Sequence, residues 1–208
     1  MQTFKITISK GNTKLGDIPS FSLSSLTTCP GKSQWCSKNC YAFKLEHQYP
    51  NVNKSYYNNY LATFEPSFTE SMDKEIKNLI KKGKKVFRIH VGGDYFSTEY
   101  IEKWYKIILN NPQMKFYSYT RSWINDELLT SLEHLKQLPN ITLFASIDSS
   151  MTQKPPVNWR VAMAGDTNNF NIPKTVFCLE QNNKVTSCSK CKLCFNNNSN
   201  VNIYFETH

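Results

Sequence analysis

The stretch "KVFRIHVGGDYFSTEYIEKWYKIILNNPQMKFYSYTR", residues 85–121, decides the fold class of this chain. Its first part, "KVFRIHVGGD", is rich in β-branched and aromatic residues and stops at glycines, which predicts a strand. "STEYIEKWYKIILNN" follows with helical spacing of its apolar residues and with Ser97 or Thr98 as the N-cap. "MKFYSYTR" then predicts a second strand. A strand, a helix and a strand in this order are typical of a parallel βα unit.

The same alternation continues on both sides of this unit. Upstream, "SFSLSS" predicts a short strand, and "FTESMDKEIKNLIKK" predicts a helix that carries Met72, Ile76, Leu79 and Ile80 on one face. Downstream, "NDELLTSLEHLKQL" predicts a helix, and "NITLFASID", "NWRVAMAGD" and "KTVFCLE" predict strands. The alternation predicts an α/β fold, either a partial (βα)5-6 barrel or a curved, mostly parallel sheet.

The length and composition predict one domain over residues 1–208. Hydrophobic residues make up 39% of the chain, enough to build one core, and no shift in composition divides it. Within this domain we expect a βα core at residues 1–177, with a cysteine loop at 27–43, and a cysteine-rich C-terminal extension at 178–208. The asparagine-rich "FNNNSNVN" of that extension predicts a loop or a mobile tail.

Two features of the composition bear on location and partners. The N-terminus lacks the apolar stretch of a secretory signal, and no segment approaches the roughly 20 apolar residues that cross a bilayer, so we expect no membrane partner and a cytoplasmic location. The formal net charge of +9 predicts attraction to polyanions and allows a nucleic acid or a nucleotide as partner. The densest basic run, residues 77–85, fits either a solvated helix end or a nucleic-acid contact.

The chain contains seven cysteines, which fall into two groups. An odd number of thiols in a reducing compartment favours metal or cluster ligation over disulfides. The second group, spaced C-x9-C-x2-C-x2-C, offers four thiolates and fits an iron–sulfur cluster or zinc. The first group, spaced C-x6-C-x3-C, offers three, which would leave one iron of a four-iron cluster open to an external ligand. The predicted ligands are Cys29, Cys36 and Cys40 in the first group and Cys178, Cys188, Cys191 and Cys194 in the second.

Polar residues follow the predicted strands at the point where each strand ends. In parallel α/β folds the carboxyl ends of the strands gather the functional groups. We therefore expect a small-molecule ligand at this mouth of the fold, oriented together with its substrate by four candidate catalytic residues. These are Asp94, Arg121, Asp148 and Asp166.

The cysteine loop "TTCPGKSQWCSKNCYAF", the strand "FRIHVGGDYFS" and the C-terminal cysteine spacing together resemble a phage and mobile-element family named for mycobacteriophage gene product eighty-eight. The resemblance spans nearly the whole chain. More distantly, the layout resembles the radical S-adenosylmethionine (SAM) superfamily, whose partial barrels carry a cysteine loop after the first strand and a Gly-Gly-Glu-Pro motif at the end of the second.

The superfamily resemblance implies roles for particular residues. Cys36 and Cys40 match the first two cysteines of the C-x3-C-x2-C motif, whereas its third position falls on Phe43, so Cys29 would supply the missing thiolate. Gly92 and Gly93 match the backbone segment that receives the methionine part of SAM, and Asp94 stands in place of Glu. These three residues are the predicted cofactor-binding residues, and the glycines would allow close approach of a ligand.

The predicted function is that of an iron–sulfur protein of a phage or mobile element. The favoured form is a radical-SAM-like enzyme, SAM-dependent or redox, that acts in the host cytoplasm on a nucleic acid, a nucleotide or another substrate. The alternative is a non-catalytic iron–sulfur or zinc protein that binds nucleic acid or a host protein. The expected cofactors are one or two [4Fe-4S] clusters and SAM, with zinc as the alternative.

Overall fold

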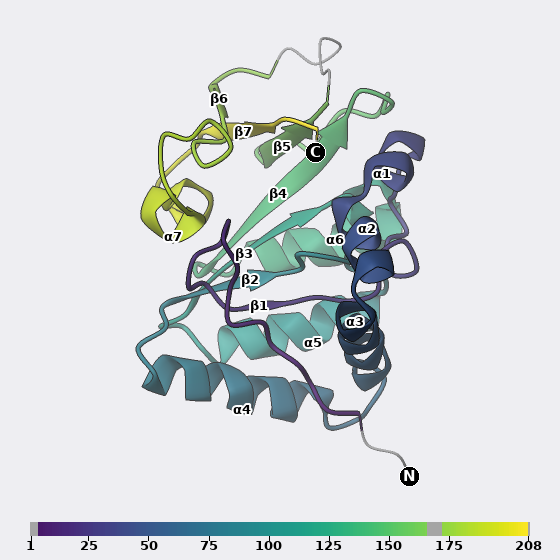
Figure 1. Ribbon diagram of the computed structural model, residues 1–208, viewed down its shortest axis with the longest axis vertical. Helices are drawn as coiled ribbons and strands as arrows, with labels where there is room; N and C mark the ends of the chain where they lie inside the picture. Colours follow the sequence, from purple (N-terminus) through teal and green to yellow (C-terminus); the bar gives the residue numbers. More distant parts are fainter. Residues whose placement is uncertain (1–3, 166–171, 208) are drawn as a thin grey trace.

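A sheet of seven parallel strands forms the centre of the protein in the computed structural model, which describes residues 4–165 and 172–207 (Figure 1). The strand order is β1-β2-β3-β4-β5-β7-β6, and every neighbouring pair is parallel. The sheet is open, with β1 and β6 at its two edges. The strands are β1 Ser20–Phe21, β2 Val86–Ile89, β3 Lys115–Thr120, β4 Ile141–Asp148, β5 Arg160–Ala164, β6 Thr175–Phe177 and β7 Asn202–Phe205.

Three helices connect the first four strands and cover one face of the sheet, as Figure 1 shows. They are α4 (Phe68–Lys81), α5 (Thr98–Leu109) and α6 (Asp126–Lys136). Polar side chains cap two of these helices. The Ser97 hydroxyl accepts a hydrogen bond from the Tyr100 amide over 3.2 Å at the start of α5, and Asn125 Oδ1 accepts from the Leu128 amide over 3.2 Å at the start of α6.

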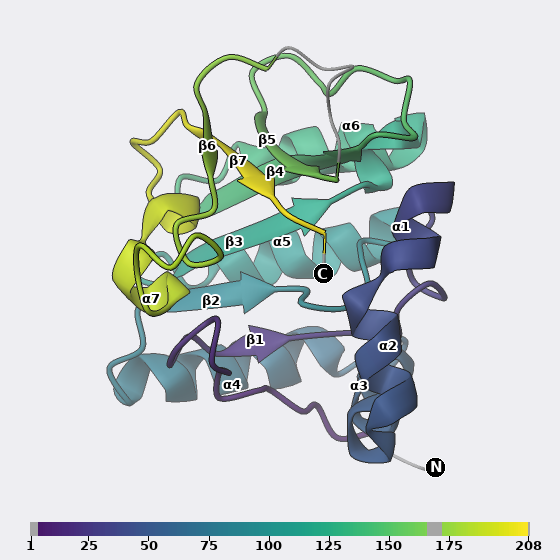
Figure 2. The same cartoon turned by 45° about the horizontal axis from the view of Figure 1, so that its top comes forward.

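The remaining helices lie at the two ends of the strands. Helices α1 (Gln34–Asn39), α2 (Tyr41–Gln48) and α3 (Pro50–Ala62) lie beyond the carboxyl ends of β1 and β2, and α7 (Cys188–Cys191) lies toward the opposite end (Figure 2). Short 3-10 turns at Ser122–Ile124 and Leu193–Phe195 complete the described helical elements.

The main core fills the space between the sheet and α4, α5 and α6. Phe21 and Phe87 project from β1 and β2 onto Trp104 of α5, with ring centroids 5.9 and 6.2 Å apart, and all three side chains are inaccessible to solvent. Side chains alternate along a strand, so the strand neighbours of these two phenylalanines point to the opposite face of the sheet, which we call the cavity face. On β2 these are Val86 and Arg88.

Most predicted elements are confirmed, and one part of the prediction is wrong. The α/β class, the parallel sheet and the helices over 68–81, 98–109 and 126–136 agree with the sequence pattern. The segment from residue 178 is not an extension, because β7 lies within it and pairs between β5 and β6. Residues 196–201 of "FNNNSNVN" form a loop, as predicted, whereas Asn202 begins β7.

Two further details differ from the expectation. The predicted strand over "KVFRIHVGGD" ends at Ile89, because His90 adopts a left-handed backbone with φ 63° and turns the chain. The segment expected as a cysteine loop, residues 27–43, contains α1 and the start of α2. The sheet is not closed, so the partial barrel stays a prediction, and so does the division into one domain.

Candidate ligand-binding site

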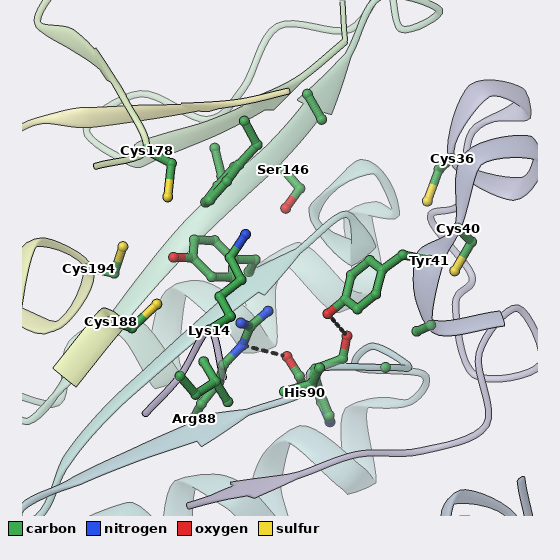
Figure 3. A pocket seen from close by; sticks show the side chains of 18 of the residues that line it. Lys14, Cys36, Cys40, Tyr41, Arg88, His90, Ser146, Cys178, Cys188 and Cys194 are labelled. Atoms are coloured by element: carbon green, nitrogen blue, oxygen red, sulfur yellow. Dashed lines mark hydrogen bonds between the residues drawn. The ribbon is translucent and has the colours of Figure 1, made fainter. Parts of the chain in front are cut away.

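A cavity of about 550 Å³ lies on the cavity face of the sheet. Its walls come from distant parts of the sequence: the turn at residues 12–15, the cysteine loop with α1, the strands β2 to β5, and the C-terminal segment from Cys178. Figure 3 shows side chains from these segments directed into one space. Cys29, in the loop after β1, and Cys178, directly after β6, both line this cavity.

The seven cysteines all line this cavity, but from opposite sides. Figure 3 places Cys36 and Cys40 beside α1 and α2, and Cys178, Cys188 and Cys194 across the space at the C-terminal wall. Apolar packing holds the second set: Cys178 and Cys194 pack with Phe144 and Ile203 of the sheet. All seven are free thiols.

The described residues contain no group of three or more cysteine, histidine, aspartate or glutamate side chains arranged to hold a metal ion. In the structure the described thiols thus do not converge on one centre, as the three or four ligands of a cluster or a closed zinc site do. The spacing of the cysteines along the chain had suggested that their thiols converge on a metal or a cluster. The individual ligand roles and the cofactors themselves stay predictions.

Burial controls the protonation of these thiols. It raises the pKa of Cys188 to about 12 and the pKa of Cys194 to about 11, because a thiolate loses its hydration inside the wall. Burial also raises the pKa of Cys29, Cys36 and Cys191, although the Arg121 guanidinium opposes the change at Cys36. At neutral pH Cys188 and Cys194 are therefore neutral thiols, which are weak nucleophiles.

Three of the four candidate catalytic residues lie together. The Arg121 Nη2 atom is 2.9 Å from Asp148 Oδ2, and its Nη1 atom is 3.2 Å from Cys36 Sγ. The backbone amide of Arg121 donates to Asp94 Oδ2 over 2.8 Å. Burial raises the pKa of Asp94, and hydrogen bonds from its neighbours oppose that rise. Asp166 lies outside the described residues.

Asp148 is fully buried and joins the end of β4 to the cysteine loop. Its Oδ2 atom accepts a hydrogen bond from the hydroxyl of Ser33, the N-cap of α1, over 2.6 Å. Its Oδ1 atom accepts from both the amide and the hydroxyl of Ser150. Together with Arg121, these donors occupy both oxygens of the carboxylate, which links β4 to the cysteine loop. This geometry suits a positioning residue better than an acid or base.

The glycines predicted to approach a ligand have close protein neighbours instead. At Gly92 an added Cβ would lie 2.9 Å from the Tyr56 ring. At Gly93 it would lie 2.6 Å from the Thr28 hydroxyl, and φ of +81° requires glycine in any case. Both glycines also line the cavity. Packing against α3 and the loop after β1 therefore explains them, and their role toward a cofactor stays a prediction.

Arg88 is a cavity residue that the sequence analysis did not identify. It points from β2 into the cavity, and its Nε atom donates to the carbonyl oxygen of His90 over 3.2 Å (Figure 3). The guanidinium lies over the ring of Tyr119, 5.1 Å from its centroid. The sequence did contain a signal for Arg88: it lies between Phe87 and Ile89, two strand residues that face the core, so its side chain points to the opposite face.

The structure thus defines an open, all-parallel α/β protein with an arginine- and cysteine-lined cavity on one face of its sheet. The chain belongs to the gene product 88 family, whose family model matches residues 4–197. It is 29% identical to the Gene 88 protein of Mycobacterium phage L5 over 203 residues, which cover 84% of this chain and 80% of that relative. It is 30% identical to the Gene 88 protein of Mycobacterium phage D29 over 204 residues, with the same shares.

These comparisons decide two of the sequence-based predictions. The resemblance to the phage family is confirmed, whereas the comparisons give no support to the radical-SAM resemblance. No solved structure matches the chain significantly. The predicted iron–sulfur function, catalytic or not, is wrong: the described thiols form no metal-binding group, and the relatives are gene product 88 proteins. None of the described helices combines the length and the apolar character that a bilayer-spanning segment needs.

Proposed function

We propose that this protein binds a small molecule in the cavity on the cavity face of its sheet. The observation that carries the proposal is the cavity itself. Its volume of about 550 Å³ lies within the range of roughly 300–1,000 Å³ that is typical of small-molecule sites. Aromatic side chains, among them Trp35, Tyr119 and Phe205, contribute apolar walls, and a few cationic groups contribute polarity.

Hydrogen bonds that fix the C-terminal wall support a pre-formed site. The amide of Cys188 donates to the carbonyl oxygen of Lys14 over 2.8 Å, which ties α7 to the turn at residues 12–15. Arg160 donates to the carbonyl oxygens of Leu193 and Val201 and so joins β5 to the segments on both sides of the asparagine-rich stretch. A wall held in this way costs a ligand little ordering of the protein on binding.

A nuclear magnetic resonance screen with uncharged and charged fragments tests the proposal. We expect fragments to shift the amide signals of cavity residues such as Val91 and Gly92. Ser146 lies on β4 and lines the cavity, so Ser146→Phe should fill part of it and weaken these shifts. Ser71→Phe is the matched control, because Ser71 is exposed on α4 and does not line this cavity. Shifts that persist in Ser146→Phe, or that scatter over the surface, would contradict the proposal.

We infer that the protein acts in the cytoplasm of the host cell. The two named relatives are phage proteins, and the seven cysteines are free, as thiols remain in a reducing compartment. Fractionation of expressing cells, followed by alkylation of the thiols before lysis, measures both the location and the redox state. Recovery of oxidised protein outside the cytoplasm would contradict the inference.

A further inference from the structure

We propose that the ligand of this cavity carries an anionic group, a phosphate or a carboxylate, and that Arg88 binds it. This inference rests on the proposed small-molecule function and names the chemical class of the ligand. It begins from the charge of Arg88, since a guanidinium remains protonated throughout the physiological pH range.

The three arginines of the chain differ in what compensates their charge. Arg121 pairs with the buried carboxylate of Asp148. Arg160 donates to three backbone carbonyl groups through its five N–H bonds. Arg88 makes no ion pair with any described carboxylate: its Nε atom donates to the carbonyl oxygen of His90, and its side chain also hydrogen-bonds to Tyr41. Among the described arginines, Arg88 is the one directed into the cavity without an anionic partner or a set of carbonyl acceptors.

The position of Arg88 is fixed from two sides, as a binding residue requires. Tyr119 of β3 lies beneath the guanidinium plane, and Tyr117 lies 6.0 Å from its centre. On the other side, the left-handed backbone of His90 turns its carbonyl group back toward Arg88, two residues earlier. A non-glycine residue in this conformation is uncommon, and here it orients a cavity side chain. Arg88 is therefore pre-organised for an anion.

The other charged side chains of the cavity do not compensate the positive charge of Arg88. Lys14 also lines the cavity, but Glu180 compensates it at 3.5 Å. The described lining contains five cationic side chains, Lys14, Lys32, Arg88, Arg121 and Lys192, against three acidic ones, Asp94, Glu180 and Glu206. A cation in a partly water-excluded space gains from pairing with an anion, and guanidinium groups match the two oxygens of phosphate and carboxylate. The lining thus favours a ligand of negative charge.

The experiment uses three probes of similar shape: phenyl phosphate, benzoate and the uncharged benzyl alcohol. Binding to the full chain is measured from the amide shifts of Val91 and Gly92, two residues of the cavity lining. We expect at least one anionic probe to bind about tenfold more tightly than benzyl alcohol, as a charge-assisted hydrogen bond of ordinary strength provides. The stronger of the two anions then identifies phosphate or carboxylate.

Substitution separates the role of Arg88 from the general charge of the protein. Arg88→Met should remove the tenfold preference and leave the affinity for benzyl alcohol unchanged, whereas the exposed Lys115→Met, outside the cavity, should leave both unchanged. If Arg88→Met does not fold, Arg88→Lys keeps the charge but not the planar fork, and should lose most of the preference. Equal affinities of the three probes, or an anion preference that survives substitution of Arg88, would overturn the proposed anion site but not the small-molecule function. Absence of binding by all three probes would overturn the small-molecule function with it.

Discussion

Replacing Asp148 with alanine should destabilise the protein more than any surface carboxylate does. The Asp148 side chain is fully buried, and the side chain of its partner Arg121 is 15% exposed, so the ion pair is shielded from water. The substitution would leave the Arg121 guanidinium without its carboxylate, and would also leave the Ser33 hydroxyl, which caps α1, without an acceptor. Asp148→Asn keeps the shape and removes the charge, and therefore measures how much of the loss comes from the charge.

The expected magnitude follows from this burial. Breaking a buried ion pair by removing one partner costs about 3–5 kcal/mol, because the other charge stays buried and uncompensated. For a chain of this size each kcal/mol lowers the midpoint of thermal unfolding by about 2–4 °C, so the midpoint should fall by about 6–20 °C. Asp17→Ala is the matched control: Asp17 pairs with Lys84 at 2.7 Å, but its side chain is 72% exposed. Exposed pairs contribute less than about 1 kcal/mol.

Urea unfolding followed by tryptophan fluorescence measures the free energy of unfolding of the three variants. A second readout tests the link to the cysteine loop. Arg121 contacts Cys36, so alkylation of Cys36, measured by peptide mass spectrometry, should be faster in Asp148→Ala, while alkylation of Cys178 in the opposite wall should not change. Equal destabilisation by Asp148→Ala and Asp17→Ala would refute the argument that burial makes this pair important.

Three further predictions concern the packing around the cavity. Gly93→Ala should lower the free energy of unfolding by about 1–3 kcal/mol in urea, because φ is +81° and the new Cβ would meet Thr28; a neutral effect would contradict the backbone argument. Asn59→Ala should speed hydrogen exchange at the Thr7 amide, which donates to Asn59 Oδ1 over 2.8 Å, while exchange within α6 serves as control. Burial, with a smaller effect of Arg88, lowers the pKa of His90 to about 3, so the unfolded chain binds a proton near pH 6.5 that the folded chain does not. Stability should therefore fall by about 2 kcal/mol between pH 6.5 and 5, and urea unfolding of His90→Gln should lack this part of the pH dependence.

The helices and strands of the βα core could be predicted because their sequence patterns depend on local chemistry. The spacing of Met72 and Ile76 predicts the buried face of α4, and Ser97 predicts the start of α5. Strand β7 could not be predicted in the same way, because four residues beside an asparagine-rich stretch carry little periodicity. Its place between β5 and β6 depends on pairing between segments that are far apart in sequence.

The grouping of three candidate residues could be predicted, whereas the cavity on the face of the sheet could not. The rule that functional groups gather at the carboxyl ends of parallel strands correctly brought Asp94, Arg121 and Asp148 together. Spacing along the chain could not show that the two cysteine groups face each other across a cavity, because that arrangement depends on how the C-terminal segment folds back. Nor could it show that the carboxylates are used by hydrogen bonds to the cysteine loop.

The turn after β2 links these observations to the proposed ligand. Its glycines suggested a cofactor, yet Gly92 and Gly93 are explained by packing against Tyr56 and Thr28, so the motif no longer argues for a ligand. The same turn instead supplies two carbonyl groups to cavity side chains: that of His90 accepts from Arg88, and that of Val91 accepts from the Tyr41 hydroxyl over 2.8 Å (Figure 3).

In our proposal the backbone of this turn does not bind the ligand. It orients Arg88, which does. Across the cavity, Cys188 and Cys194 are neutral thiols at physiological pH, because burial raises their pKa to about 12 and 11. They cannot compensate the charge of Arg88. In our proposal an anionic ligand does so, and the charge of the ligand, rather than the cysteine spacing, is what the cavity recognises.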